Sequence, residues 1–86
     1  MYMKLLLVDD NKNFSKLLKL SLESEHYNID TADNASSALN KMKQAVFDWV
    51  ISDINMGEIN GIELSKKIKS EYPQTKIILM TVCVCK

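Results

Sequence analysis

The chain has 86 residues, of which 47% are hydrophobic and 26% charged, and its 11 basic and 11 acidic residues cancel to a formal net charge of zero. This balance argues against non-specific nucleic-acid binding and against attachment to a membrane surface, because both depend on excess positive charge. The early apolar run at residues 5–8 is too short for a signal-peptide core or a membrane span, so we expect one small cytoplasmic domain.

The first elements are a strand and a helix. Residues 4–8 form a continuous apolar run that stops at Asp9 and Asp10, a pattern typical of a strand buried on both faces of a parallel sheet. From Asn13 the apolar residues recur at helical spacing. They are Phe14, Leu17, Leu18 and Leu22. The sequence therefore predicts a helix whose apolar face these residues form.

A second strand and helix follow. Residues 27–32 alternate in character and predict a strand. Asn34 is the expected N-cap of a helix that runs to about residue 44. The apolar positions of this helix are Ala38, Leu39 and Met42.

The third strand is predicted at residues 47–53 and, like the first, ends on an aspartate. A helix opens at Gly61 and stops before Pro73, as proline requires. Its apolar positions are Ile62, Leu64 and Ile68. Residues 76–80 predict a fourth apolar strand that ends at Thr81. Strands alternating with helices indicate an α/β fold with a parallel sheet covered on both faces.

Polar residues follow three of the four predicted strands. In a parallel α/β sheet the carboxyl ends of the strands form one edge, where ligands bind. Asp9, Asp10, Asp53 and Thr81 are expected to meet there. Three neighbouring carboxylates repel one another unless a cation neutralises them, and Mg²⁺ suits an all-oxygen site that also takes ligands from a phosphate.

Three motifs carry a family resemblance. They are residues 5–11 (LLLVDDN), residues 53–61 (DINMGEING) and residues 77–81 (IILMT). Together they resemble the first strand with its acidic pair, the acceptor motif Asp-x-x-Met-Pro-x-x-x-Gly and the fourth strand of response-regulator receiver domains. The resemblance implies a flavodoxin-like (CheY-like) doubly wound sheet, here with four strands in the order 2-1-3-4 and three helices.

The same resemblance implies a role for each site residue. Asp53 would accept a phosphoryl group from a sensor histidine kinase. Asp10, Asp53 and the backbone carbonyl of Asn55 would ligate Mg²⁺, and Asp9 would act through a metal-bound water. Thr81 would hydrogen-bond the phosphate as the switch hydroxyl. Such a module signals and is not a stand-alone enzyme; at most it would phosphorylate and dephosphorylate itself.

The sequence departs from the family pattern in two places. Gly57 stands where receivers usually have proline, which loosens the loop after the acceptor. The sequence also ends soon after the fourth strand, so we expect residues 1–86 to be a single, C-terminally truncated receiver domain without its fifth strand and last two helices. The lysine that ends the fifth strand would be missing with them, and Lys86 lies too close to Thr81 to replace it.

This departure predicts that the fourth strand is an exposed edge and that one face of the sheet lacks helical cover. Self-association through that edge is therefore expected. Two alternatives remain open: a phosphorylation-impaired interaction module, and a fragment of a longer response regulator. A plainer interpretation is also open, in which the aspartates cap helices or form turns and Thr81 is an ordinary strand residue. Cys83 and Cys85 are expected to be small apolar strand residues.

Overall fold

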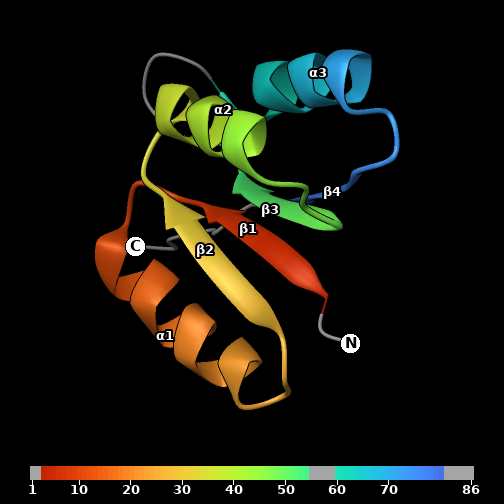
Figure 1. Ribbon diagram of the computed structural model, residues 1–86. Coiled ribbons are helices and arrows are strands. Elements are labelled where there is room, and N and C mark those ends of the chain that lie inside the picture. The colour runs from red at the N-terminus through yellow and green to blue at the C-terminus, as the bar shows by residue number, and fades with distance from the viewer. Residues whose placement is uncertain (1–2, 55–59, 81–86) are drawn as a thin grey trace.

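The computed structural model describes residues 3–54 and 60–80 and shows strands and helices that alternate along the chain (Figure 1). In chain order the elements are β1 (Lys4–Val8), α1 (Lys12–Glu23), β2 (Asn28–Ala32), α2 (Ala35–Gln44), β3 (Trp49–Asp53), α3 (Gly61–Glu71) and β4 (Lys76–Met80). The strands form one sheet in the order β2-β1-β3-β4, and every neighbouring pair is parallel. The predicted α/β fold and its strand order are confirmed.

The element boundaries differ slightly from the prediction at the third strand. β3 begins at Trp49, two residues later than expected. The residue before it, Asp48, is hydrogen-bonded to Lys4 at the start of β1. The Asp48 carboxylate accepts a hydrogen bond from the backbone N–H of Lys4 at 2.9 Å, and the Asp48 N–H donates to the Lys4 carbonyl at 2.8 Å. Asp48 thereby ties the amino ends of the two central strands together.

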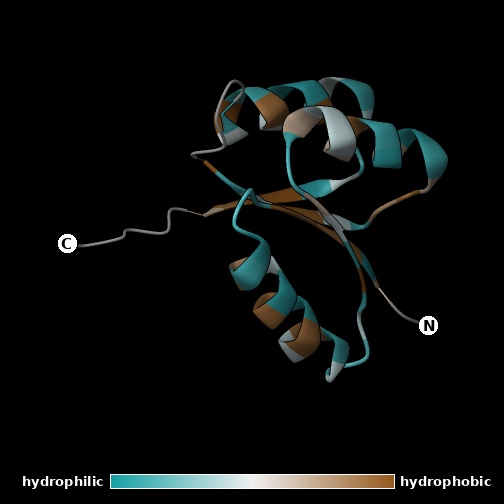
Figure 2. Ribbon diagram, turned by 90° about the vertical axis from the view of Figure 1, so that its left-hand side faces the viewer, coloured by the Kyte–Doolittle hydropathy of each residue, from teal (hydrophilic) through white to brown (hydrophobic). Residues whose placement is uncertain are grey.

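The helices lie in two layers, with α2 and α3 on one face of the sheet and α1 on the other (Figure 2). The core under α2 and α3 is fully buried at Leu6, Val8, Val50, Leu64 and Ile68. A smaller core lies under α1. It consists of Leu5, Leu7 and Ile29, with Leu18 and Leu22 of the helix packed against them. β1 is therefore buried on both faces, as its continuous apolar sequence predicts, whereas Trp49 and Ile51 of β3 are only partly buried on the α1 face.

The outer part of the α1 face is open. An apolar groove of about 300 Å³ lies there, and it is lined by Met3, Leu5, Leu22, Tyr27, Trp49, Ile51 and Ile78. Within the described residues β4 pairs on one side only, with β3, and its Ile78 and Leu79 are 43% and 39% exposed. In the part of the chain that the structure describes, the expected exposed edge and uncovered apolar face are both present.

Two residues that the sequence predicts on apolar helix faces are exposed instead. Leu17 is 66% exposed because it lies on the flank of α1 that is turned away from the sheet. Ile62, in the first turn of α3, is 43% exposed because Gly61 and Leu64 take the buried positions of that helix. No helix of the described residues is long and apolar enough to cross a membrane.

All three helices begin with an asparagine cap. The side chains of Asn11, Asn34 and Asn60 accept hydrogen bonds from the backbone N–H groups of Phe14, Ser37 and Glu63. Each bond satisfies one of the amide donors that a helix start leaves without an intrahelical partner. The prediction of Asn34 as an N-cap is confirmed. Asn11 places the start of α1 soon after the carboxyl end of β1, and Asn60 caps α3 after the longer connection from β3.

An ion pair joins α2 to β2. The Lys41 ammonium group donates to the Asp30 carboxylate at 2.8 Å and also to the carbonyl of Thr31. Burial acts to raise the pKa of Asp30, but the hydrogen bonds from Lys41 and from the Thr31 N–H, with the charges of Lys41 and Lys19, outweigh it and lower that pKa. The pair therefore favours the ionised carboxylate.

Candidate functional site

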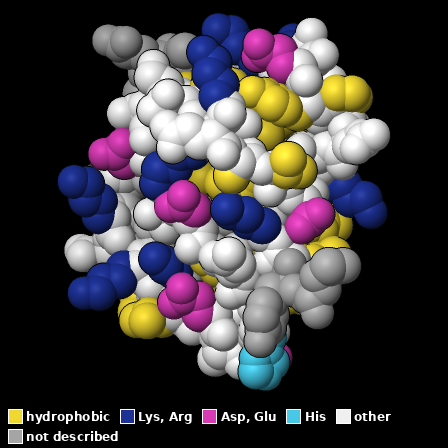
Figure 3. Space-filling model, viewed as in Figure 1, with side chains coloured by type: hydrophobic (Ala, Val, Ile, Leu, Met, Phe, Trp, Pro, Cys, Tyr) yellow, Lys and Arg dark blue, Asp and Glu magenta, His cyan; other side chains and the backbone are white. Residues whose placement is uncertain are grey.

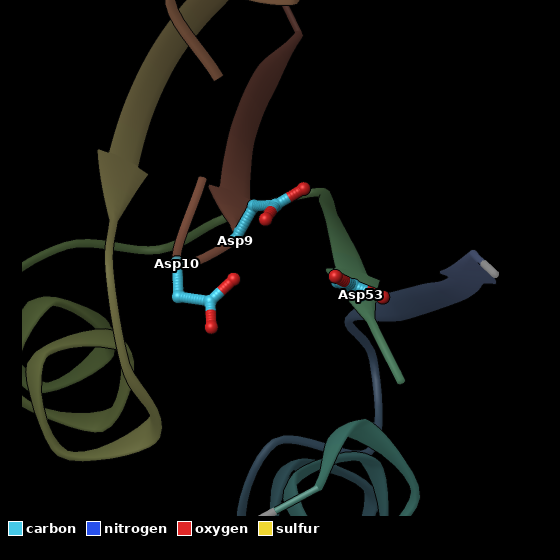
Figure 4. Close-up of side chains that lie close together, drawn as sticks. All are labelled: Asp9, Asp10 and Asp53. Carbon is cyan, nitrogen blue, oxygen red and sulfur yellow. The ribbon is translucent and has the colours of Figure 1, made fainter. Parts of the chain in front are cut away.

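Three carboxylates meet at the carboxyl edge of the sheet. Asp9 and Asp10 follow β1 directly, and Asp53 is the last residue of β3, the strand beside it (Figure 4). One carboxylate oxygen from each residue lies within 4.8 Å of the others. Adjacent parallel strands explain the cluster, because parallel strands that pair in register end together. The predicted convergence of these three aspartates is confirmed.

The three carboxylates differ in exposure. Asp9 is 2% exposed and Asp53 is 8% exposed, whereas Asp10 is open to solvent. One oxygen of Asp9 accepts a hydrogen bond from the Asn11 N–H at 2.9 Å. Its other oxygen is buried and has no hydrogen-bond partner among the described residues. A buried oxygen without a partner costs free energy, so this atom is suited to bind a ligand.

The pKa of Asp9 reflects this environment. Burial is the largest cause and raises the pKa above its ordinary value, and the negative charges of Asp53 and Asp10 raise it further. The hydrogen bond from the Asn11 N–H acts in the opposite direction and only partly offsets them. In the absence of a cation the cluster therefore resists carrying its full negative charge.

The donor set fits a hard divalent cation. The three aspartates supply oxygen ligands alone, which are those that Mg²⁺ prefers, and Asp10 leaves one side open to water or to a ligand oxygen. Asp9 contributes a buried oxygen that needs a positive partner. Asn55 and Thr81, the other two predicted site residues, lie outside the described residues, as do Gly57, Cys83, Cys85 and Lys86.

Gly61 is a site residue whose role the sequence does not predict beyond the start of a helix. A Cβ at this position would lie 2.9 Å from the α-carbon of Ile54 and closer still to the carbonyl oxygen of Asp53. The Gly61 N–H also donates to the Ile54 carbonyl at 2.8 Å. Glycine is therefore needed for α3 to approach the backbone that carries Asp53. The glycine that ends the motif at residues 53–61, and not its place at a helix start, is the signal that could have indicated this contact.

The chain matches a family model. That model, described as the response regulator receiver domain, covers residues 5–84.

Two curated relatives show the same similarity. The transcriptional regulatory protein ZraR of Klebsiella oxytoca is 38% identical over 77 residues, which are 90% of this chain and 17% of that protein. The response regulator ArlR of Staphylococcus aureus (strain Mu50 / ATCC 700699) is 35% identical over 78 residues, which are 91% of this chain and 35% of that protein. The chain thus spans between 17% and 35% of the length of these two relatives.

Solved structures agree in fold. The response regulator TrrA of Thermotoga maritima, in complex with Mg²⁺-BeF, is 43% identical with a TM-score of 0.87, over 92% of this chain and 69% of that one. The chemotaxis response regulator CheY4 of Vibrio cholerae is 32% identical with a TM-score of 0.89, over 99% and 72% of the two chains. A structure of TrrA in complex with the histidine kinase ThkA is 42% identical with a TM-score of 0.87, over 93% and 69%.

Proposed function

Because this chain belongs to the response regulator receiver domain family, we propose that Asp53 accepts a phosphoryl group from a sensor histidine kinase. The observation that carries the proposal is the position of Asp53. Its carboxylate ends a central strand and lies within 4.8 Å of the carboxylates of Asp9 and Asp10. The strand end holds this nucleophile in place, and the exposed Asp10 beside it marks the side from which a donor would approach.

The proposed transfer needs little covalent machinery. A carboxylate oxygen of Asp53 attacks the phosphorus of a phosphohistidine, an acyl phosphate forms and the P–N bond breaks. The bonding electrons stay on the imidazole nitrogen, and the ring leaves as neutral histidine because its other nitrogen carries a proton. Positioning and electrostatics supply most of the rate enhancement in such transfers. That TrrA has been solved with the histidine kinase ThkA supports a kinase as the partner of this chain.

We assign the Mg²⁺ ligands as follows. Asp10, Asp53 and the backbone carbonyl of Asn55 bind the ion directly, and Asp9 binds it through a water molecule. When bound, the ion supplies positive charge that offsets the charge of the phosphoryl oxygens. The oxygen-only cluster and the raised pKa of Asp9 support this assignment. The Mg²⁺-BeF complex of TrrA supports it from a relative.

Thr81 is proposed as the switch hydroxyl that binds a phosphate oxygen after transfer. Met80, the residue before it, pairs in register with Asp53 across β3 and β4. We further propose that residues 1–86 act as one cytoplasmic domain, since every described strand joins a single sheet. The domain is a signalling module whose own chemistry is limited to self-phosphorylation and self-dephosphorylation.

Self-association through β4 is a second proposal, and it is compatible with the first. No described strand pairs with the outer side of β4, and its Ile78 and Leu79 are exposed. Both observations support the proposal, because an apolar strand edge is a template for another strand. An assembly module without phosphorylation is the weaker alternative, since the carboxylate cluster is intact. Sedimentation at tens of micromolar tests self-association: wild type should dimerise and Ile78→Lys should not, and a monomeric wild type refutes it.

Phosphorylation is tested with a small phosphodonor. The protein is incubated with acetyl phosphate and Mg²⁺, and its intact mass is measured. Wild type should gain one phosphate, and Asp53→Asn should gain none. Asp30→Asn is the matched control, because it removes a carboxylate that lies outside the cluster, and it should be phosphorylated like the wild type. An unmodified wild type, or an adduct on Asp53→Asn, contradicts the proposal.

A further inference from the structure

A polar cavity lies beside the carboxylate cluster, between α1 and the turn that joins β2 to α2. Its volume is about 430 Å³, which is within the range of cavities that hold small organic ligands. It is lined by Asp9, Lys12, Ser15, Lys16, Lys19, Thr31, Ala32, Asp33 and Ser37. Asp9 is the one residue that this cavity shares with the cluster, so most of its lining has no part in the proposed phosphotransfer.

One residue of the cavity lining has a buried hydroxyl without a hydrogen-bond partner among the described residues. It is Ser15, which is 6% exposed. A helical serine commonly donates to a carbonyl of the preceding turn, but no such bond is present here. A buried hydroxyl without a partner is destabilising, and Ser15 is part of the cavity lining, so a ligand that offers its hydroxyl a hydrogen bond would remove that cost.

Three lysines of α1 surround the same cavity. Lys12, Lys16 and Lys19 are spaced at i, i+4 and i+7, which places them along one side of the helix. Dark-blue side chains are accordingly seen on the side of the molecule that α1 occupies in Figure 1 (Figure 3). The charge of Lys19 also helps to lower the pKa of Asp30 on β2.

The remaining charges of the lining are two carboxylates. Asp33 is exposed, and Asp9 is buried. Three lysines against two aspartates leave a net positive lining, and the hydroxyls of Ser15, Thr31 and Ser37 add neutral donors. Lys41, the nearest cation of α2, is already paired with Asp30. This combination of charges and hydroxyls suits a phosphate group attached to a small molecule that carries hydroxyl groups.

We propose that this cavity binds a small phosphate ester. Its phosphate lies among Lys12, Lys16 and Lys19, and its hydroxyls bond to the serine and threonine side chains of the lining. The site is separate from phosphoryl transfer to Asp53, because its phosphate-binding groups come from α1 and not from the end of β3. A ligand bound there would contact both α1 and the start of α2.

The test uses glucose 6-phosphate as the probe and glucose as its neutral counterpart. The probe is titrated into the ¹⁵N-labelled Asp53→Asn protein in EDTA, so that the acceptor aspartate and divalent ions play no part. Backbone amide shifts should move and saturate at residues 12–19 and 31–37 with glucose 6-phosphate and not with glucose. A response at the carboxylate cluster alone, or no saturation, refutes the site.

Matched variants distinguish specific binding in this cavity from non-specific electrostatic attraction. Lys16→Gln with Lys19→Gln should weaken binding about tenfold, because each phosphate–lysine contact is charge-assisted. Lys66→Gln with Lys69→Gln removes the same charge from exposed positions on α3 and should leave the affinity within about twofold. Equal losses in both variants would mean an adventitious anion only. Ser15→Ala should weaken binding about threefold, and an unchanged affinity would remove the hydroxyl from the site.

Discussion

The backbone of Gly61 lies against the backbone of Asp53, so closely that no side-chain carbon fits between them. The contact joins the first residue of α3 to the last residue of β3. This contact therefore affects both the stability of the fold and the orientation of the Asp53 carboxylate.

Gly61→Ala is expected to lower the free energy of unfolding by about 2 kcal/mol, because the new methyl group displaces backbone and not a flexible side chain. Phosphorylation by acetyl phosphate should slow at the same time, because the backbone of Asp53 and Ile54 shifts. Urea unfolding and intact mass measure the two effects. Ser70→Ala, at an exposed position of the same helix, is the control and should be neutral or slightly stabilising. A Gly61→Ala protein as stable as the wild type would contradict the contact.

Asp9→Asn is expected to stabilise the metal-free protein by about 1 kcal/mol at neutral pH, because it removes a buried carboxylate held near two others. The sign follows from the raised pKa. The folded protein binds the Asp9 proton more tightly than the unfolded chain, so the cost of ionisation is absent below the ordinary pKa of 3.8 and is complete above the folded pKa. The extra stability of Asp9→Asn over the wild type should therefore disappear in acid. Thermal unfolding of both proteins in EDTA at several pH values measures this difference. An advantage that persists below pH 3.8 would point to another cause.

Addition of Mg²⁺ should raise the melting temperature of the wild-type protein. An ion that binds only the folded state stabilises it by RT ln(1 + [L]/Kd), or about 1.4 kcal/mol at roughly ten times the Kd. Asp53→Asn should lose most of this effect, whereas Asp30→Asn should retain it, because Asp30 is not part of the carboxylate cluster. Equal stabilisation of all three proteins would mean that Mg²⁺ binds elsewhere.

Lys41→Met should lower the free energy of unfolding at neutral pH by about 0.5 kcal/mol, a small value because both partners are partly exposed. The pKa of Asp30 is lowered in the folded state, so the contribution of the pair is present above the ordinary value of 3.8 and is lost as the pH falls through the folded pKa. The difference between the two proteins should therefore shrink in acid, where the hydrogen bond from Lys41 to the Thr31 carbonyl is the part that remains. Lys43→Met, an exposed position on the same helix, controls for the loss of charge.

The sequence predicts most of this fold because its signals are local and consistent. Apolar runs that stop at Asp9, Asp10 and Asp53 predict the ends of two central strands, and the rule that parallel strands end together predicts the cluster. Asn34 is recognisable as a cap from its position before a helical pattern. Each of these inferences needs only the spacing of residues along the chain.

The parts that failed depend on contacts between distant residues. Helical spacing cannot distinguish Leu17 from Leu18, although Leu17 is exposed and Leu18 packs against the sheet. The contact of Gly61 with Asp53 is a matter of tenths of an ångström across the sheet edge, and a helix-start glycine alone does not reveal it. The sequence does not predict the cavity along α1 either, because the cavity forms only where α1 meets the turn after β2.

The asparagine caps have a consequence for measurements on this protein. An amide side chain does not titrate, so the starts of all three helices hold the same hydrogen bonds in acid as at neutral pH. Many helices start instead on aspartate, and protonation of such caps in acid would mix with the signal from any other carboxylate. Here an acid titration followed by a backbone signal has no background from these caps, so it reports carboxylates that lie outside them, such as Asp9, Asp30 and Asp48.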